Sequence, residues 1–240
     1  MDERAYPNWN NCHADVVATC YPKMARGFFD DVVMPSISKL NSDIRRYSTS
    51  KDPVDLFYLS DTEDVLEETM KAFCLSIHSI WERQLRSYLV GCAKSNERHS
   101  SLIKKIENEK WEKLCMLFLK LRGISMRSFK AYDVLDTLQL AANVCRHGDG
   151  PSARRLYEKR PDFWLKGVDV DFSMPGNPNI EGVSERYSDM VITQEILANY
   201  VEAIELFWAQ ANYIYNESIL EKHPTLIAKL EKARPLWPMI

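Results

Sequence analysis

The sequence has 240 residues, of which 45% are hydrophobic and 27% charged, with a formal net charge of −3. This composition argues against a disordered chain, and no apolar run approaches the roughly 18 to 20 residues that cross a bilayer. The net charge argues against a uniformly basic surface, so any contact with nucleic acid must be a local patch. The first residues, MDERAYPNWNN, do not resemble a secretory signal. We therefore expect a cytoplasmic protein without membrane segments.

Helical periodicity dominates the chain. Only 8 residues are glycines, and apolar residues recur at the 3.6-residue spacing of helices, so we expect an all-α protein. A loop-like start rich in Asn and Pro precedes an amphipathic helix whose apolar stripe runs from Phe29 to Tyr47. Pro35 interrupts this stripe, so the helix is either kinked there or begins anew with Pro35 in its first turn.

The longest predicted helix runs from Asp61 to about Ala93. Asp61 or the threonine after it can cap the helix, and acidic residues crowd its first turns, where the helix dipole favours negative charge. About 30 residues at 1.5 Å each would span a domain, so we expect the other helices to pack on this one. His78 is interpreted as a core histidine, and Glu82 with Arg86 as an i,i+4 ion pair.

The second half of the chain contains shorter helices and one loose segment. We expect helices at about 111–121, ended by Gly123; from 128 or 130 to 147; at 152–159; from a Thr193 cap to 215; and after Pro224. Residues 166–190 are rich in Gly and Pro and are predicted to form one long irregular loop. Together these elements predict a single helical domain over 1–240. It would comprise an N-terminal helical extension at 1–55, an up-and-down bundle at 60–220 and a C-terminal tail at 221–240.

The cysteines and the common cofactor motifs point away from metals and cofactors. The six cysteines include no CxxC pair, and most fall among apolar residues, so they are interpreted as free thiols of a reducing compartment. Cys12, His13 and Cys20 fit none of the usual structural zinc spacings. The sequence also lacks P-loop, GxGxxG, GxSxG, HExxH and EF-hand patterns. We therefore expect no metal and no cofactor.

The most distinctive stretch is AANVCRHGDGPSARRL, at residues 141–156. On a helix, one sector opposite Leu138, Ala141 and Cys145 contains the polar residues Asp136, Gln139, Asn143, Arg146 and His147. The simplest interpretation of this sector is the solvated face of a surface helix. The negative C-terminal end of the helix dipole would favour a positively charged imidazolium at His147.

The residues after this helix suggest a chemical site. Gly148, Asp149 and Gly150 can end the helix and turn the chain back, which would bring a group of cations towards the histidine: Arg154, Arg155, Lys159 and Arg160. A histidine beside guanidinium groups suits phosphodiester chemistry, because imidazole transfers protons while cations hold phosphate and stabilise its developing charge.

The pattern LQLAANVCRHGDG, at residues 138–150, resembles the motif helix of the HEPN superfamily. That motif is an Arg followed by four to six residues and then His, commonly with Asn directly after the Arg. CLSIHSIWERQLRSYL, at 74–89, resembles the helix that packs against it, and the similarity covers about 60–165 and, less clearly, 190–220. The resemblance implies a helical bundle, frequently a homodimer, and metal-independent RNA cleavage in bacterial toxin–antitoxin or anti-phage systems.

The match to the motif lacks its arginine. Asn143 and His147 match the Asn-x-x-x-His part, whereas Ala142 occupies the usual arginine position and Gln139 an alternative one. The resemblance implies that His147 is the acid or base and that Asn143 orients it. Either Arg146 supplies the missing charge, or a remote arginine such as Arg83, Arg86 or Arg154 does, or cleavage has been lost.

These considerations leave two main functional hypotheses, beside a third in which a partner enzyme attaches a nucleotidyl group at or near Tyr157. In the first, the protein binds and cleaves RNA, with Gln139, Arg83, Arg154 and Arg155 on the substrate, and its partners are RNA, a second copy and an antitoxin or other defence-complex protein. In the second, which the missing arginine favours, it is a non-catalytic helical adaptor or regulatory subunit of a defence complex.

Overall fold

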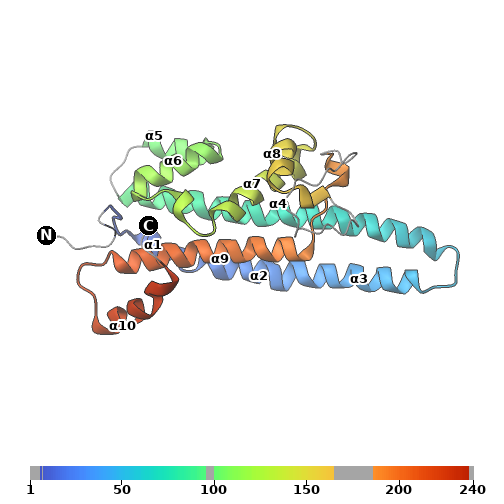
Figure 1. Cartoon of the computed structure of the whole chain (residues 1–240), viewed down its shortest axis with the longest axis horizontal. Helices are drawn as coiled ribbons and strands as arrows, with labels where there is room; N and C mark the ends of the chain where they lie inside the picture. Colours follow the sequence, from blue (N-terminus) through green and yellow to red (C-terminus); the bar gives the residue numbers. More distant parts are fainter. Residues whose placement is uncertain (1–5, 7, 96–99, 165–185, 238–240) are drawn as a thin grey trace, which may run out of the picture. The chain divides into compact units, whose positions relative to one another are not determined.

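The computed structural model describes residues 6, 8–95, 100–164 and 186–237, and among these it contains helices and no strand. The prediction of an all-α protein with bundle-like helix packing is confirmed. The α-helices, shown in Figure 1, are α1 (His13–Ala18), α2 (Tyr21–Phe28), α3 (Met34–Ser48), α4 (Asp55–Ser95), α5 (Ser100–Asn108), α6 (Trp111–Arg122), α7 (Tyr132–His147), α8 (Pro151–Lys159), α9 (Gln194–Glu217) and α10 (Pro224–Ala233). No helix of the described residues combines the length and apolarity that a membrane span requires.

The chain divides into two compact units whose segments alternate along the sequence. Unit 1 comprises residues 1–28, 79–135 and 200–240, and unit 2 comprises residues 29–78 and 136–199. Helices α4, α7 and α9 contribute residues to both units. The sequence-based division at residues 55, 60 and 220 does not coincide with these boundaries and stays a prediction.

Unit 2 contains the α3–α4 hairpin, the last three turns of α7, and α8. Helix α3 runs beside the first half of α4 (Figure 1). The ring centres of Tyr47, near the end of α3, and Tyr58, near the start of α4, are 5.6 Å apart. Ile37 of α3 and Ile77 of α4 are buried. The backbone N–H of Val191 donates to the carbonyl of Phe163 at 2.6 Å, which ties the segment before α9 to the residues that follow α8.

Unit 1 is built around aromatic side chains. The Trp81 ring of α4 lies 4.8 Å from Phe207 and 5.7 Å from Trp208 of α9, and Phe207 stacks on Phe129 at 4.6 Å. Phe118 of α6 packs against the same cluster. Large rings bury extensive apolar area, so this cluster explains why α4, α6 and α9 assemble.

Several predicted elements need correction. Helix α4 begins before Asp61, at Asp55, and extends for 41 residues. The N-terminal start is not a loop, because α1 and α2 occupy 13–28, and the polar segment after α4 leads into α5, which was not predicted. The predicted loop at 166–190 lies mostly outside the described residues, and its end contains a short 3-10 helix at Tyr187–Asp189.

Candidate functional site at the α7–α8 corner

The last turns of α7, residues 148–150 and helix α8 form the candidate site, called here the α7–α8 corner. Around the predicted polar stripe, α7 is more enclosed than expected, because Leu140 and Val144 are buried as well as Leu138 and Ala141, whereas Cys145 is half-buried. Gln139 and Asn143 are half-buried, whereas Arg146 and His147 are exposed. The helix therefore exposes only a narrow polar strip that widens at its C-terminus.

The turn between the two helices depends on glycine conformations. Gly148 has φ +68° and donates its N–H to the carbonyl of Val144 at 2.8 Å, which ends α7 with a left-handed residue. Gly150, with φ +153°, precedes α8. A Cβ built at either glycine would meet no atom within 4 Å, so the backbone conformation rather than space requires glycine at both positions.

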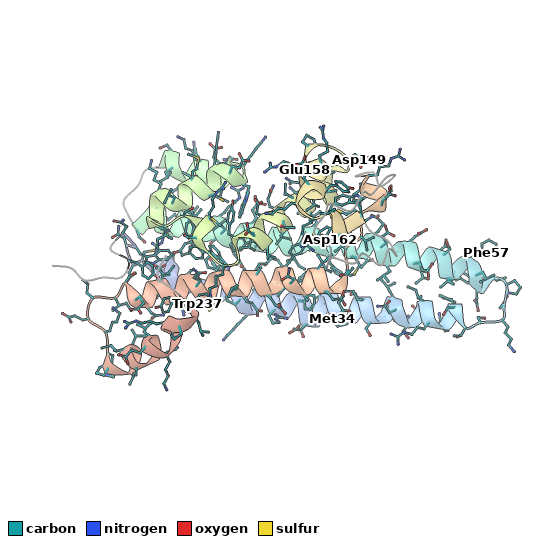
Figure 2. The ribbon with its side chains drawn as sticks, viewed as in Figure 1. Met34, Phe57, Asp149, Glu158, Asp162 and Trp237 are labelled. Atoms are coloured by element: carbon teal, nitrogen blue, oxygen red, sulfur yellow. The ribbon has the colours of Figure 1, made fainter. Side chains whose placement is uncertain are left out.

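Asp149 anchors this turn to the rest of unit 2. Its carboxylate accepts a hydrogen bond from the backbone N–H of Tyr187 at 2.5 Å. The Tyr187 hydroxyl in turn donates to Glu68 of α4 at 3.0 Å, and the Lys71 ammonium lies 4.3 Å from the centre of the Tyr187 ring. Figure 2 shows Asp149 and Glu158 in the α7–α8 region. The sequence placed Asp149 in the turn but did not predict this anchoring contact, because its partner lies 38 residues away.

Helix α8 presents cations outwards while its apolar side packs inwards. Ala153 and Leu156 are buried, and Arg154 and Arg155 are exposed. The expected group of four cations divides in two, because Lys159 pairs with Asp136 at 2.9 Å and Arg160 pairs with Asp162 through two contacts of 2.8 and 2.6 Å. The exposed arginines of the corner are Arg146, Arg154 and Arg155.

The predicted catalytic groups are not bonded to one another. Among the described residues, the side chains of Asn143, Arg146 and His147 form no mutual hydrogen bond, and the imidazole is exposed at the end of α7. Arg83, predicted to bind substrate, is an exposed residue of unit 1, whereas the α7–α8 corner belongs to unit 2. Among the secondary predictions, His78 is buried, and Arg86 forms the expected pair with Glu82 at 2.5 Å.

Two cavities among the described residues are lined by other side chains. In unit 2, a cavity of about 460 Å³ is lined in part by the apolar Ile37, Leu66 and Met70 and by the acidic Glu63 and Glu195. In unit 1, a cavity of about 370 Å³ between α1 and α4 is lined in part by His13, Lys94 and Ser95. Within the described part of the chain, no group of His, Cys, Asp or Glu side chains is arranged to hold a metal ion.

A buried polar cluster in unit 1 was missed by sequence reasoning. The guanidinium of Arg122 is fully buried and pairs with Asp15 at 2.8 Å, and the Tyr88 hydroxyl donates to the same carboxylate oxygen at 2.8 Å. Helical spacing could have predicted the burial of Arg122, because this residue follows Phe118 by four positions and Leu114 by eight and so lies on the apolar side of α6. An arginine in the last turn of a helix is otherwise expected to be solvated.

Comparison of the chain with protein-family models, with curated proteins and with solved structures finds no significant match.

Proposed function

We propose that the protein binds RNA, and that the α7–α8 corner holds the phosphate backbone. The supporting observation is that Arg146, Arg154 and Arg155 are exposed on one glycine-bounded turn and the helix after it, in a chain whose net charge is −3. Guanidinium groups bind phosphate oxygens through paired hydrogen bonds. Release of counterions from RNA adds a binding free energy that does not depend on its sequence.

Cleavage is the finer part of this proposal and follows from the HEPN resemblance of residues 138–150. In the proposed step, the RNA 2′-hydroxyl attacks the adjacent phosphate, His147 transfers the proton and a guanidinium stabilises the developing charge without a metal. Ala142 stands at the usual arginine position of the motif and is fully buried. The guanidinium nearest to His147 along α7 is that of Arg146, the preceding residue. We place this activity in a bacterial anti-phage or toxin–antitoxin system in the cytoplasm, with a second copy completing the site.

Fluorescence anisotropy with a labelled single-stranded RNA tests RNA binding. We expect the double variant Arg146→Glu/Arg154→Glu to bind at least about ten-fold more weakly than the parent at low salt. The slope of log K against log salt should fall by about 0.7 for each phosphate that the variant no longer neutralises. The matched control is Lys120→Glu/Lys229→Glu, which makes the same charge change at exposed lysines of unit 1. Equally weakened binding in both double variants, or a parent that does not bind, would refute the proposed interface.

A second candidate function, a helical adaptor, is favoured by the end of the α3–α4 hairpin. Leu56, Phe57 and Tyr58 are 64%, 75% and 51% exposed at the start of α4, and Figure 2 shows Phe57 at this end of the hairpin. A group of exposed apolar side chains is typical of a protein-binding surface. In this function the hairpin end, rather than the α7–α8 corner, binds the partner.

The adaptor function is tested by isolating a tagged copy from the organism that encodes it. We expect a stoichiometric partner to copurify with the parent and to be absent with Leu56→Ser/Phe57→Ser. The control variant Met116→Ser removes an apolar side chain of similar exposure from α6, and the partner should stay bound. A partner that also remains with the double variant argues against binding at the hairpin end.

A further inference from the structure

Two cysteines of unit 1 that are far apart in sequence place their sulfur atoms side by side. Cys12 directly precedes α1, and Cys92 is buried within α4. Their Sγ atoms are 3.6 Å apart, although 80 residues separate them along the chain. A disulfide bond is about 2.05 Å long, so a shift of about 1.5 Å would bring these atoms to bonding distance.

A fixed cation lies beside this pair. Nη1 of Arg122 is 3.9 Å from the Cys12 sulfur and donates to the carbonyl of Asn10 at 2.7 Å. The same guanidinium pairs with Asp15 and lies 3.8 Å from the centre of the Trp9 ring. Because these contacts hold the guanidinium in place, a thiolate at Cys12 would find the positive charge already positioned.

The two thiols have different environments. Hydrogen bonding with Cys92 and the charge of Arg122 outweigh burial and the charge of Asp15, and they lower the pKa of Cys12 to about 6. The contact with Cys12 and burial raise the pKa of Cys92. The lowered pKa of Cys12 favours its thiolate, and the Cys12 sulfur lies 3.6 Å from the Cys92 sulfur. Cys12 is also the more exposed of the two.

We propose that Cys12 and Cys92 form a peroxide-reactive thiol pair, in which Cys12 is the nucleophile and Cys92 the resolving thiol. This assignment is independent of the RNA-binding proposal, because both cysteines belong to unit 1 and the α7–α8 corner belongs to unit 2. It adds a modification site to a chain whose cysteines were interpreted from the sequence as free thiols of a reducing compartment.

The reaction uses hydrogen peroxide as its oxidant and balances in two steps. The Cys12 thiolate attacks one peroxide oxygen, the O–O bond breaks and Cys12 becomes a sulfenic acid, while the leaving hydroxide takes up a proton to form water. The Cys92 thiol then attacks the sulfenic sulfur, an S–S bond forms and a second water leaves. Overall two thiols are oxidised to one disulfide, and one peroxide is reduced to two waters. The disulfide would join the segment before α1 to α4.

A second thiol contact in the chain provides an internal comparison. Cys74 of α4 and Cys145 of α7, both in unit 2, also interact. There, hydrogen bonding with Cys145 and then burial raise the pKa of Cys74 well above its usual value. A protonated thiol is a poor nucleophile, so we expect peroxide to oxidise Cys12 before Cys74.

Mass spectrometry after treatment of the folded full-length chain with peroxide tests the assignment. We expect a Cys12–Cys92 disulfide in the parent and in the control variant Cys20→Ser, whose exposed thiol lies outside the pair. In Cys92→Ser, the sulfenic acid should persist at Cys12 and be trapped by dimedone. Oxidation that leaves Cys12 reduced, or that links Cys74 to Cys145 first, would overturn the proposal.

The pH dependence of Cys12 alkylation gives a second readout that requires no variant. The iodoacetamide rate at Cys12 should be half-maximal near pH 6 and level above pH 7, because the rate follows the thiolate fraction. A synthetic peptide of residues 8–16 should instead respond near pH 8.5. The midpoint does not depend on how accessible the sulfur is. Identical midpoints for chain and peptide would contradict the proposed activation of Cys12.

Discussion

At the scale of single residues, the Asp15–Arg122 pair shows how a buried charge is tolerated. The two side chains are 2% and 0% exposed, and their charged atoms are 2.8 Å apart. The Asp15 carboxylate also accepts hydrogen bonds from the backbone N–H of Cys12 at 2.9 Å and from the Tyr88 hydroxyl. Because burying an isolated ion costs several kcal/mol, every one of these contacts offsets part of the loss of hydration.

Substituting Asp15 by Asn tests the importance of this pair. The variant keeps the side-chain shape but leaves the Arg122 cation buried without its anion, so we expect the free energy of unfolding to fall by about 3–5 kcal/mol. Urea unfolding followed by circular dichroism measures the change.

The control for Asp15→Asn is Lys113→Ala, which removes the partner of Glu109. This ion pair spans 3.2 Å, and its lysine side chain is 68% exposed, so its removal should cost less than about 1 kcal/mol. Similar costs for the two substitutions would show that the buried pair contributes no more to stability than a surface pair does.

The polar strip of α7 shows what the sequence could predict about the candidate site. The spacing of Asn143, Arg146 and His147 placed them on the more exposed side, because helical periodicity is a local property. The pairing of Lys159 with Asp136 was not predicted, since it depends on how α8 lies against α7. Sequence reasoning therefore identified the cations but not which of them are neutralised.

At the scale of elements, the sequence left open whether the helix is kinked at Pro35 or begins anew with Pro35 in its first turn. Helix α3 begins at Met34 with Pro35 in its first turn, and a π-helical segment, Phe29–Val33, precedes it. Proline has no N–H to donate and its ring crowds the carbonyl four residues earlier. The wider π turn lies directly before the proline, where the regular i to i−4 hydrogen-bond pattern is interrupted.

Helix α5 was missed because its sequence is polar and its anchoring contact is distant. Arg86 of α4 donates to the carbonyls of Ile106 and Glu109, at and just beyond the end of α5. Helix carbonyls at a C-terminus lack partners within the helix, so this arginine stabilises an element 20 residues away. The sequence predicted only the local Glu82–Arg86 pair, which is one part of this arrangement.

At the scale of the whole molecule, helix content was predictable and the grouping of helices was not. Periodicity and the scarcity of glycine predicted an all-α chain, and the structure confirms it. The two units each combine segments from distant parts of the sequence, because aromatic packing such as that of Trp81 with Phe207 determines which helices meet. No local pattern predicts such a pairing.

A prediction for the assembled molecule follows if the proposed cleavage uses groups from two copies of the chain. Among the described side chains of one chain, those of His147 and Arg146 form no hydrogen bond with each other. If His147 of one copy acts with Arg146 of another across a two-fold axis, His147→Ala and Arg146→Ala should each lower RNA cleavage in EDTA by about 100-fold or more. Mixing the two variants should restore about one quarter of the parent activity, because half of the dimers are mixed and each has one complete site.

Light scattering establishes the dimer, and a gel assay with labelled RNA measures cleavage. An active parent whose mixed variants stay inactive would place both groups in one chain, whereas a monomeric, inactive parent would exclude cleavage and leave RNA binding as the function of the α7–α8 corner.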